Sequence, residues 1–279
     1  MGPAGRGMKS RRERLDRLLV ERGLARSRER AQALVLAGVV RIDGRPAGKP
    51  GESISIAAAV TVVAPDHPFV GRGGVKLEGA LERLGIDPAG RIALDVGAST
   101  GGFTDCLLRR GAQRVYALDV GAGLLDWSLR CDSRVVVLEG INARFLTPEH
   151  LPGPVDLAAI DVSFISLRLI LPPLPAVLAP GADVLALVKP QFEVGRREVG
   201  AGGVVREPRL HLKVLESVAA AASLAGLGVR GGCASPITGA EGNREFFLYL
   251  KAGGGTLEAG LQDILGGMVH GRSGSAATD

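Results

Sequence analysis

Short apolar runs that alternate with helical segments constrain the fold of this chain more than any other feature. They lie at residues 91–97, 114–120, 135–139, 156–161, 183–188 and 245–250. Runs of this length that are rich in Val, Ile and Leu predict buried strands, and strands that alternate with helices predict a mostly parallel sheet with helices on both faces. We therefore expect residues 73–268 to form an α/β domain with a doubly wound, Rossmann-like sheet.

A smaller unit precedes this domain. Leu15, Leu18 and Leu19 recur at helical spacing before Gly23, and a second helical stripe runs from Ser27 to Gly38. Residues 39–42 and 54–63 have strand-forming composition, and Asp43-Gly44 is a hairpin signal. We expect an α+β domain over residues 1–64, a connector over 65–72, where apolar periodicity is absent, and a frayed tail over 269–279.

Positive charge is concentrated in the small unit. Residues 1–50 hold 13 Lys and Arg against five Asp and Glu, whereas the remainder holds 21 against 24. Such a block predicts a face that binds the phosphates of a nucleic acid, although a merely solvated surface is the alternative for a charge run taken alone. The residues expected to contact the phosphates are Arg14, Arg17, Arg26, Arg28, Arg30 and Lys49.

Other classes of protein find little support in the sequence. No apolar run approaches the roughly 20 residues of a membrane-spanning helix, and the N-terminus does not resemble a signal peptide, so we expect a cytoplasmic protein. The three Cys are far apart, and the four His show no metal-ligand spacing. We therefore expect no metal, no membrane association and no evident protein partner.

A glycine-rich turn follows the first strand of the large unit. It lacks the third glycine of the dinucleotide fingerprint and a GK[ST] ending, so it favours S-adenosylmethionine over NAD or a nucleoside triphosphate. An acidic residue ends the next strand, where it can accept hydrogen bonds from a ribose. Glycines needed only for packing are the alternative for the turn, and a loop-capping amide is the alternative for Asn142. The expected cofactor residues are Asp95, Gly97, Ala98, Ser99, Thr100, Gly101, Gly102, Phe103, Asp119, Val120 and Asn142.

Lys189 has an unusual position for a lysine. It follows the apolar strand at 184–188 and precedes Pro190, which places an ammonium at the carboxyl end of a buried strand. A buried lysine requires a carboxylate, and Asp161 at the end of the neighbouring strand is the expected partner. Gly195 to Val205 follows directly and is either a mobile flap or a plain loop.

Two resemblances connect these features to known families. The phrase LARSRERAQALVLAGVVRIDG resembles the small RNA-binding fold of ribosomal protein S-four. The motifs GRGGVKLEGAL, DVGASTGGFTD, IDVSFIS, LVKPQFEVGR, GGVV and GNREFFLYL, in this order, resemble the TlyA family, which is similar to the FtsJ-type ribose methyltransferases. The second resemblance covers nearly the whole chain.

The resemblance to the TlyA family implies a reaction. It implies transfer of a methyl group from S-adenosylmethionine to the 2′-hydroxyl of cytidine in ribosomal RNA within ribosomal subunits. It also implies a catalytic tetrad of Lys76, Asp161, Lys189 and Glu245. From the sequence alone, Glu245 could equally pair with an Arg.

Substrate range and alternative functions complete the expectations. The stretch ahead of Arg14 resembles the extension of family members that act on both ribosomal subunits, although a disordered basic leader explains it nearly as well. The alternatives to an enzyme are a cofactor-binding ribosome-assembly or RNA-binding factor without catalysis and, with least support, a membrane-active hemolysin.

Overall fold

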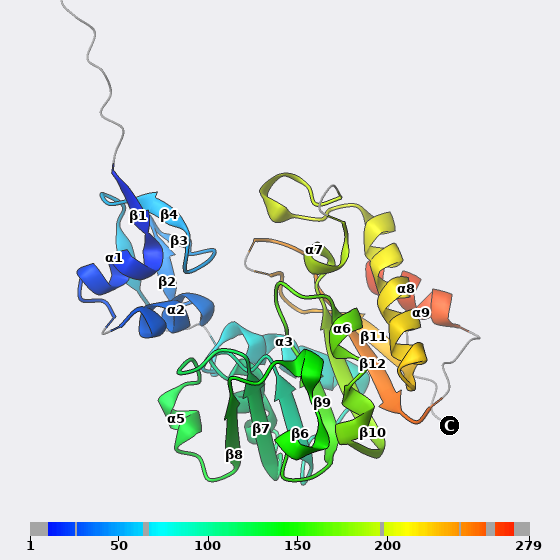
Figure 1. The fold of residues 1–279 in the computed structure, drawn as a ribbon. Helices are drawn as coiled ribbons and strands as arrows, with labels where there is room; N and C mark the ends of the chain where they lie inside the picture. The colour runs from blue at the N-terminus through cyan, green and yellow to red at the C-terminus, as the bar shows by residue number, and fades with distance from the viewer. Residues whose placement is uncertain are drawn as a thin grey trace, which may run out of the picture. The chain divides into compact units, whose positions relative to one another are not determined.

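The computed structural model describes residues 11–25, 27–63, 67–195, 198–239, 241–254 and 260–270. The chain divides into two compact units, Met1–Asp66 and His67–Asp279 (Figure 1). Each unit has a hydrophobic core of its own.

The small unit packs two helices against short antiparallel strands. Strand β1 (Arg12–Arg14) pairs with β4 (Ser53–Ser55), and β2 (Val40–Ile42) pairs with both β3 (Arg45–Pro46) and β5 (Val60–Val62). Helices α1 (Leu15–Glu21) and α2 (Arg28–Leu36) bury Leu15, Leu19 and Ala31 in the core. The predicted helices, hairpin and strands are present, and β1 is an addition that the sequence reasoning missed.

A seven-stranded sheet forms the centre of the large unit. Its order is β11-β12-β10-β9-β6-β7-β8, and every neighbouring pair is parallel except the two pairs that involve β12. The strands are β6 (Ile92–Val96), β7 (Arg114–Asp119), β8 (Val135–Glu139), β9 (Val155–Ile160), β10 (Leu178–Val188), β11 (Leu227–Ala234) and β12 (Phe246–Ala252). The predicted Rossmann-like fold is confirmed.

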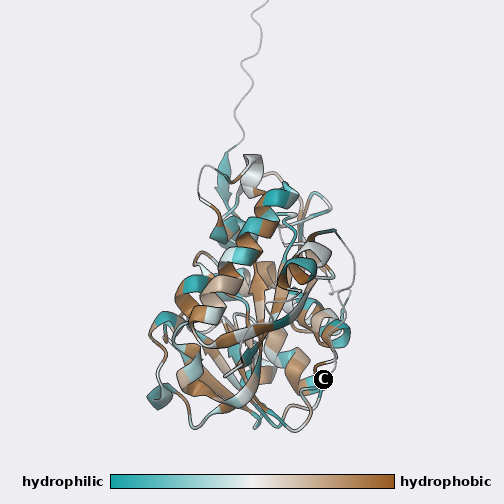
Figure 2. Cartoon of the chain, turned by 90° about the vertical axis from the view of Figure 1, so that its right-hand side faces the viewer, coloured by the Kyte–Doolittle hydropathy of each residue, from teal (hydrophilic) through white to brown (hydrophobic). Residues whose placement is uncertain are grey.

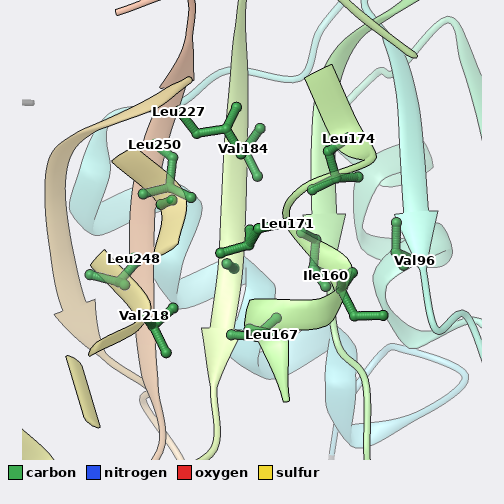
Figure 3. Packing of buried hydrophobic residues seen from close by; sticks show 14 of the residues in the cluster. Val96, Ile160, Leu167, Leu171, Leu174, Val184, Val218, Leu227, Leu248 and Leu250 are labelled. Atoms are coloured by element: carbon green, nitrogen blue, oxygen red, sulfur yellow. The ribbon is translucent and has the colours of Figure 1, made fainter. Parts of the chain in front are cut away.

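Helices cover both faces of this sheet because successive side chains of a strand point to opposite sides. One core cluster joins the strands to α6 (Leu167–Ile170), α8 (Pro208–Leu224) and α9 (Leu261–His270); Figure 3 shows Val96, Ile160 and Val184 of this cluster with Leu167 and Val218. A second core cluster lies on the opposite face of the sheet. It packs the side chains of the strands that point to that face against α3 (Arg72–Leu84), α4 (Gly102–Arg109) and α5 (Trp127–Arg130). In Figure 2 the central strands are coloured mainly as hydrophobic, whereas the outer helices carry both colours.

Short helical turns complete the large unit. The α-helical turn α7 (Pro190–Glu193) follows β10, and the 3-10 turns are η1 (Ala143–Phe145), η2 (Pro148–His150), η3 (Leu174–Val177) and η4 (Ala201–Gly203). Among the described residues, no helix is both long and apolar enough to cross a membrane.

Three boundaries differ from the sequence analysis. Residues 67–72 of the expected connector belong to the large unit, because Phe69 is buried in its core and α3 already begins at Arg72. The expected tail begins too early, since Val269 is buried in α9, which ends at His270; residues 271–279 lie outside the described residues. Strand β11 was missed because it contains Gly231 and Gly232, which weaken a strand pattern.

Candidate active site

Four charged side chains meet at one edge of the sheet. Lys76 lies on α3, Asp161 follows β9, and Lys189 follows β10. Glu245 precedes β12, but β12 is antiparallel and pairs its Phe246 with Val188, so Glu245 lies at the same edge. The structure thus brings together all four residues of the expected tetrad from distant parts of the chain.

The tetrad consists of two close ion pairs. Lys76 Nζ lies 2.6 Å from Glu245 Oε2, and Lys189 Nζ lies 2.6 Å from Asp161 Oδ1. Lys76, Lys189 and Glu245 are buried, whereas the Asp161 side chain keeps an exposed fraction of 20%. The carboxylate that sequence reasoning assigned to Lys189 is therefore its actual partner, and Glu245 pairs with a lysine rather than with an Arg.

Each ion pair influences the other. Burial lowers the pKa of Lys76, but the charges of Asp161 and Glu245 outweigh burial and raise the pKa overall. Burial raises the pKa of Asp161, but Lys189 and Lys76 outweigh burial and lower the pKa overall. Opposite charges at short range favour the charged forms, so Lys76 and Asp161 are both ionised at neutral pH.

Two neighbours of Lys189 escaped the sequence reasoning. Ser163 Oγ accepts a hydrogen bond from Lys189 Nζ at 2.9 Å, and the ammonium lies 5.8 Å from the centre of the Phe192 ring. Phe164 contacts that ring at a centroid distance of 5.0 Å, is 89% exposed and has a φ of +64°. An exposed aromatic residue in a left-handed conformation is uncommon. The signal for Ser163 and Phe164 was their place beside Asp161 in the IDVSFIS motif, and the signal for Phe192 was its place beside Lys189 in the LVKPQFEVGR motif.

The glycine-rich turn requires its first glycine for steric reasons. Gly97 has a φ of +88°, and a Cβ atom there would lie 2.4 Å from the backbone oxygen of Asp161. The neighbouring Asp95 is fully buried and accepts two hydrogen bonds from Thr104 through Oδ2, whereas Oδ1 has no hydrogen-bond partner in the described structure. Burial raises the pKa of Asp95 to about 7.

Asp119 connects this turn to the loop after β7. Its Oδ2 accepts a hydrogen bond from Ser99 N and its Oδ1 accepts one from Gly121 N, both at 2.8 Å. Each carboxylate oxygen retains a further lone pair for a ligand hydroxyl. Val120, beside Asp119, is exposed. The turn and the acidic strand end therefore form one unit, as the sequence pattern indicated.

The remaining expected cofactor residues differ in whether their side chains are buried or exposed. Ala98 and Thr100 are buried in the turn, and Phe103 is buried against Phe247, so the side chain of Phe103 is part of the core. Asn142 is exposed, and its Oδ1 accepts a hydrogen bond from Arg144 N at the start of η1. This is the capping role that the sequence analysis left open.

Helices α3 and α4 begin side by side. A Cβ atom on Gly102 would lie 2.9 Å from Gly74 N and 3.1 Å from Gly73 Cα. The absence of a side chain at Gly102 therefore allows a close backbone approach. This approach places the helix that carries Lys76 against the helix that follows the glycine-rich turn.

The segment after Lys189 is attached to the strand that follows Glu245. Asn243 is 1% exposed, accepts a hydrogen bond from Val205 N and donates one to Gly203 O. His211 Nε2 lies 2.9 Å from Val205 O. Residues 203–205 are thus fixed, and residues 196–197 of the expected flap lie outside the described residues.

Several expected RNA-binding residues already have acidic partners within the small unit. Arg14 and Arg28 both contact the buried Asp16, at 2.7 and 3.2 Å, and Arg17 lies 3.8 Å from Glu13. Arg30 lies in the first turn of α2, and Lys49 lies between β3 and β4. Arg26 lies outside the described residues.

No group of three or more His, Cys, Asp or Glu that could hold a metal gathers among the residues that the structure covers.

The sheet order, the single antiparallel strand and the glycine-rich turn define a Rossmann-like methyltransferase. The model of the FtsJ-like methyltransferase family matches residues 69–252, and that of the S4 domain matches residues 13–57. The chain belongs to the FtsJ-like methyltransferase family, and its amino-terminal unit contains an S4 domain.

The relatives include named methyltransferases. The chain is 54% identical to "16S/23S rRNA (cytidine-2'-O)-methyltransferase TlyA" of Mycobacterium tuberculosis, over 87% of this chain and 91% of the relative. It is 39% identical to Hemolysin A of Brachyspira hyodysenteriae, over 85% and 98%. The solved structure of a candidate hemolysin from Streptococcus thermophilus matches with a TM-score of 0.71 and 42% identity, over 94% and 96%.

These findings confirm three predictions from the sequence. The resemblance to the TlyA family is confirmed by the relatives. The chain is an enzyme of the methyltransferase class, and the cofactor of this class is S-adenosylmethionine.

Proposed function

We propose that this protein transfers a methyl group from S-adenosylmethionine to the 2′-hydroxyl of cytidine in the RNA of both ribosomal subunits. The tetrad carries the proposal, because two buried Lys–carboxylate pairs stand beside a glycine-rich turn at the carboxyl edge of the sheet, where open α/β sheets bind ligands. The relative that is 54% identical has this reaction in its name.

The residues at the turn fit the cofactor. Asp119 has lone pairs for the two ribose hydroxyls, and Asp95 Oδ1, behind the turn, is a buried acceptor without a hydrogen-bond partner among the described residues. When bound, S-adenosylmethionine supplies a methyl group on a positively charged sulfur. Among the expected cofactor residues, we assign Asp119 and the backbone of residues 97–102 to its binding.

The tetrad is assigned the chemistry on the ribose. A ribose hydroxyl is a poor nucleophile at neutral pH, so it needs orientation and a route for its proton. Lys189 donates a hydrogen bond that orients the hydroxyl oxygen, and the carboxylate of Asp161, whose side chain reaches solvent, accepts the hydroxyl proton as the oxygen gains the methyl group. Lys76, which is paired with Glu245, holds Asp161 electrostatically, and Lys76 and Glu245 complete the wall beside the ribose.

The small unit is assigned to RNA binding. Its S4 domain and its excess of positive charge favour a phosphate-rich partner. The partner that follows from the proposed reaction is ribosomal RNA within ribosomal subunits, and the cytoplasm is where such subunits are found.

The proposal is tested by incubation of the protein with tritiated S-adenosylmethionine and unmodified small and large subunits, followed by mapping of 2′-O-methylation. We expect a labelled cytidine in each subunit, loss of the label in Lys189→Ala with RNA binding retained, and full labelling by the control Lys213→Ala, an exposed lysine on α8. Absence of label from both subunits with the wild-type protein would refute the assignment to ribosomal RNA. Label that persists in Lys189→Ala would refute the role of Lys189.

A further inference from the structure

The ammonium of Lys189 has two polar partners, Asp161 and Ser163. Asp161 carries the opposite charge, and Ser163 accepts a hydrogen bond. Asp161 Oδ1 lies 2.6 Å away, but the two atoms do not meet in hydrogen-bond geometry, and Oδ1 has no other such bond among the described residues. Ser163 Oγ, at 2.9 Å, accepts a well-formed hydrogen bond from the same ammonium. Hydrogen bonds weaken steeply away from their preferred angles, so Ser163 rather than Asp161 fixes the rotation of the ammonium.

We propose that Ser163 is the positioning residue of the proposed reaction and directs an N–H of Lys189 at the ribose 2′-hydroxyl. A lysine ammonium has three donors in a fixed tetrahedral arrangement. Once Ser163 holds one of them, the directions of the other two are set, and the Phe192 ring, 5.8 Å away, borders one side. This inference rests on the proposed function, because the oriented group acts only if a hydroxyl binds there.

The surroundings of Ser163 favour this role over a structural one. Ser163 is exposed, and Lys189 is the one hydrogen-bond partner of its side chain in the described part of the chain. The loop that carries it is fixed independently, since Glu193 accepts hydrogen bonds from Ser166 Oγ at 2.6 Å and from Leu167 N at 2.7 Å. Glu193 lies on the turn after Lys189, so the two segments that present Lys189 and Ser163 are joined.

The first test does not depend on activity. In protein labelled with ¹⁵N-lysine, the ammonium signal of Lys189 is assigned by its absence from Lys189→Arg, and its hydrogen-exchange rate is measured. We expect at least a several-fold faster exchange in Ser163→Ala, and a wild-type rate in Ser163→Thr, which keeps the hydroxyl. Ser128→Ala is the matched control and should show the wild-type rate, because it removes an exposed hydroxyl on α5 that contacts Asp126 rather than Lys189 and leaves the loop intact. Equal rates in Ser163→Ala and wild type would overturn the proposal.

The second test separates positioning from binding. With ribosomal subunits as substrate, we expect kcat of Ser163→Ala to fall about tenfold, as for loss of a hydrogen bond to a charged group, while KM stays nearly unchanged. Ser163→Thr, which keeps the hydroxyl, should have the kcat of the wild type. An unchanged kcat in Ser163→Ala beside an active wild-type protein would refute the positioning role alone. A wild-type protein that labels no subunit would refute the proposed function and leave the exchange result standing.

Discussion

The charge of Asp95 depends strongly on its place in the fold. Its carboxylate is fully buried, one oxygen has no hydrogen-bond partner in the described structure, and burial raises its pKa from an ordinary value of 3.8 to about 7. The folded protein therefore binds a proton at this site more tightly than the unfolded chain does. Such a group stabilises the fold at low pH, and this contribution is lost as the pH rises through the window between the two values.

We predict that Asp95→Asn removes the loss of stability that the wild type undergoes at this site as the pH rises. Between pH 4 and pH 7 the free energy of unfolding of the wild type should fall relative to that of the variant by up to about 4 kcal/mol, at 1.36 kcal/mol per unit of pKa shift. The predicted quantity is the difference in the free energy of unfolding between the two proteins. The contributions of His211 and of other groups that titrate in the same window are common to both proteins and cancel in this difference. Urea unfolding at each pH measures it. Parallel pH profiles for the two proteins would show that Asp95 is ionised in both states.

At the scale of elements, the junction of α3 and α4 makes a steric prediction. Gly102→Ala would place a methyl group 2.9 to 3.2 Å from backbone atoms of residues 71, 73 and 74, which cannot rotate away. We expect a loss of about 1 to 3 kcal/mol in the free energy of unfolding and lower methyl transfer, since α3 carries Lys76.

Gly266 provides the matched control for this substitution. It lies within α9, and a Cβ atom there would meet nothing within 4 Å. Gly266→Ala should therefore leave stability unchanged or raise it by up to about 1 kcal/mol. Denaturant unfolding compares the two variants, and an equal loss in both would show that crowding at Gly102 is not the cause.

The elements also show what the sequence could predict. Six of the seven strands of the large sheet were predictable because each is an apolar run, whereas β11 contains Gly231 and Gly232. The structure explains Gly232: a Cβ atom would lie 2.7 Å from the backbone oxygen of Phe247. Strand ends placed Asp161, Lys189 and Asp119 correctly, because carboxyl ends of parallel strands share an edge.

Contacts between distant residues were beyond the sequence pattern. The pairing of Lys76 with Glu245 depends on the close approach of α3 and on the reversed direction of β12, and neither follows from local periodicity. The contact of Ser163 with Lys189 depends on the path of an irregular loop. The same limit applies to the small unit, where the arginines expected to face RNA also hold the buried Asp16.

At the scale of the whole molecule, the division into two compact units predicts that damage to one unit spares the other. Asp16 is the most informative residue to change, because its carboxylate is fully buried and accepts hydrogen bonds from Arg14, Arg28 and Gln32. The hydrogen bond from Arg14 lowers the pKa of Asp16, so its contribution to stability is present above pH 4 and is lost as the pH falls.

Asp16→Asn should destabilise the small unit by about 1 to 3 kcal/mol, because the amide cannot accept as many hydrogen bonds from the arginines. We expect weaker binding to ribosomal subunits and an earlier first transition in calorimetry, with the affinity for S-adenosylhomocysteine unchanged in isothermal titration. Glu21→Gln, which alters an exposed carboxylate on the same helix, should match the wild type in all three measurements. Should Asp16→Asn also weaken binding of S-adenosylhomocysteine, the two units would be energetically coupled, and the prediction that damage to one unit spares the other would be wrong.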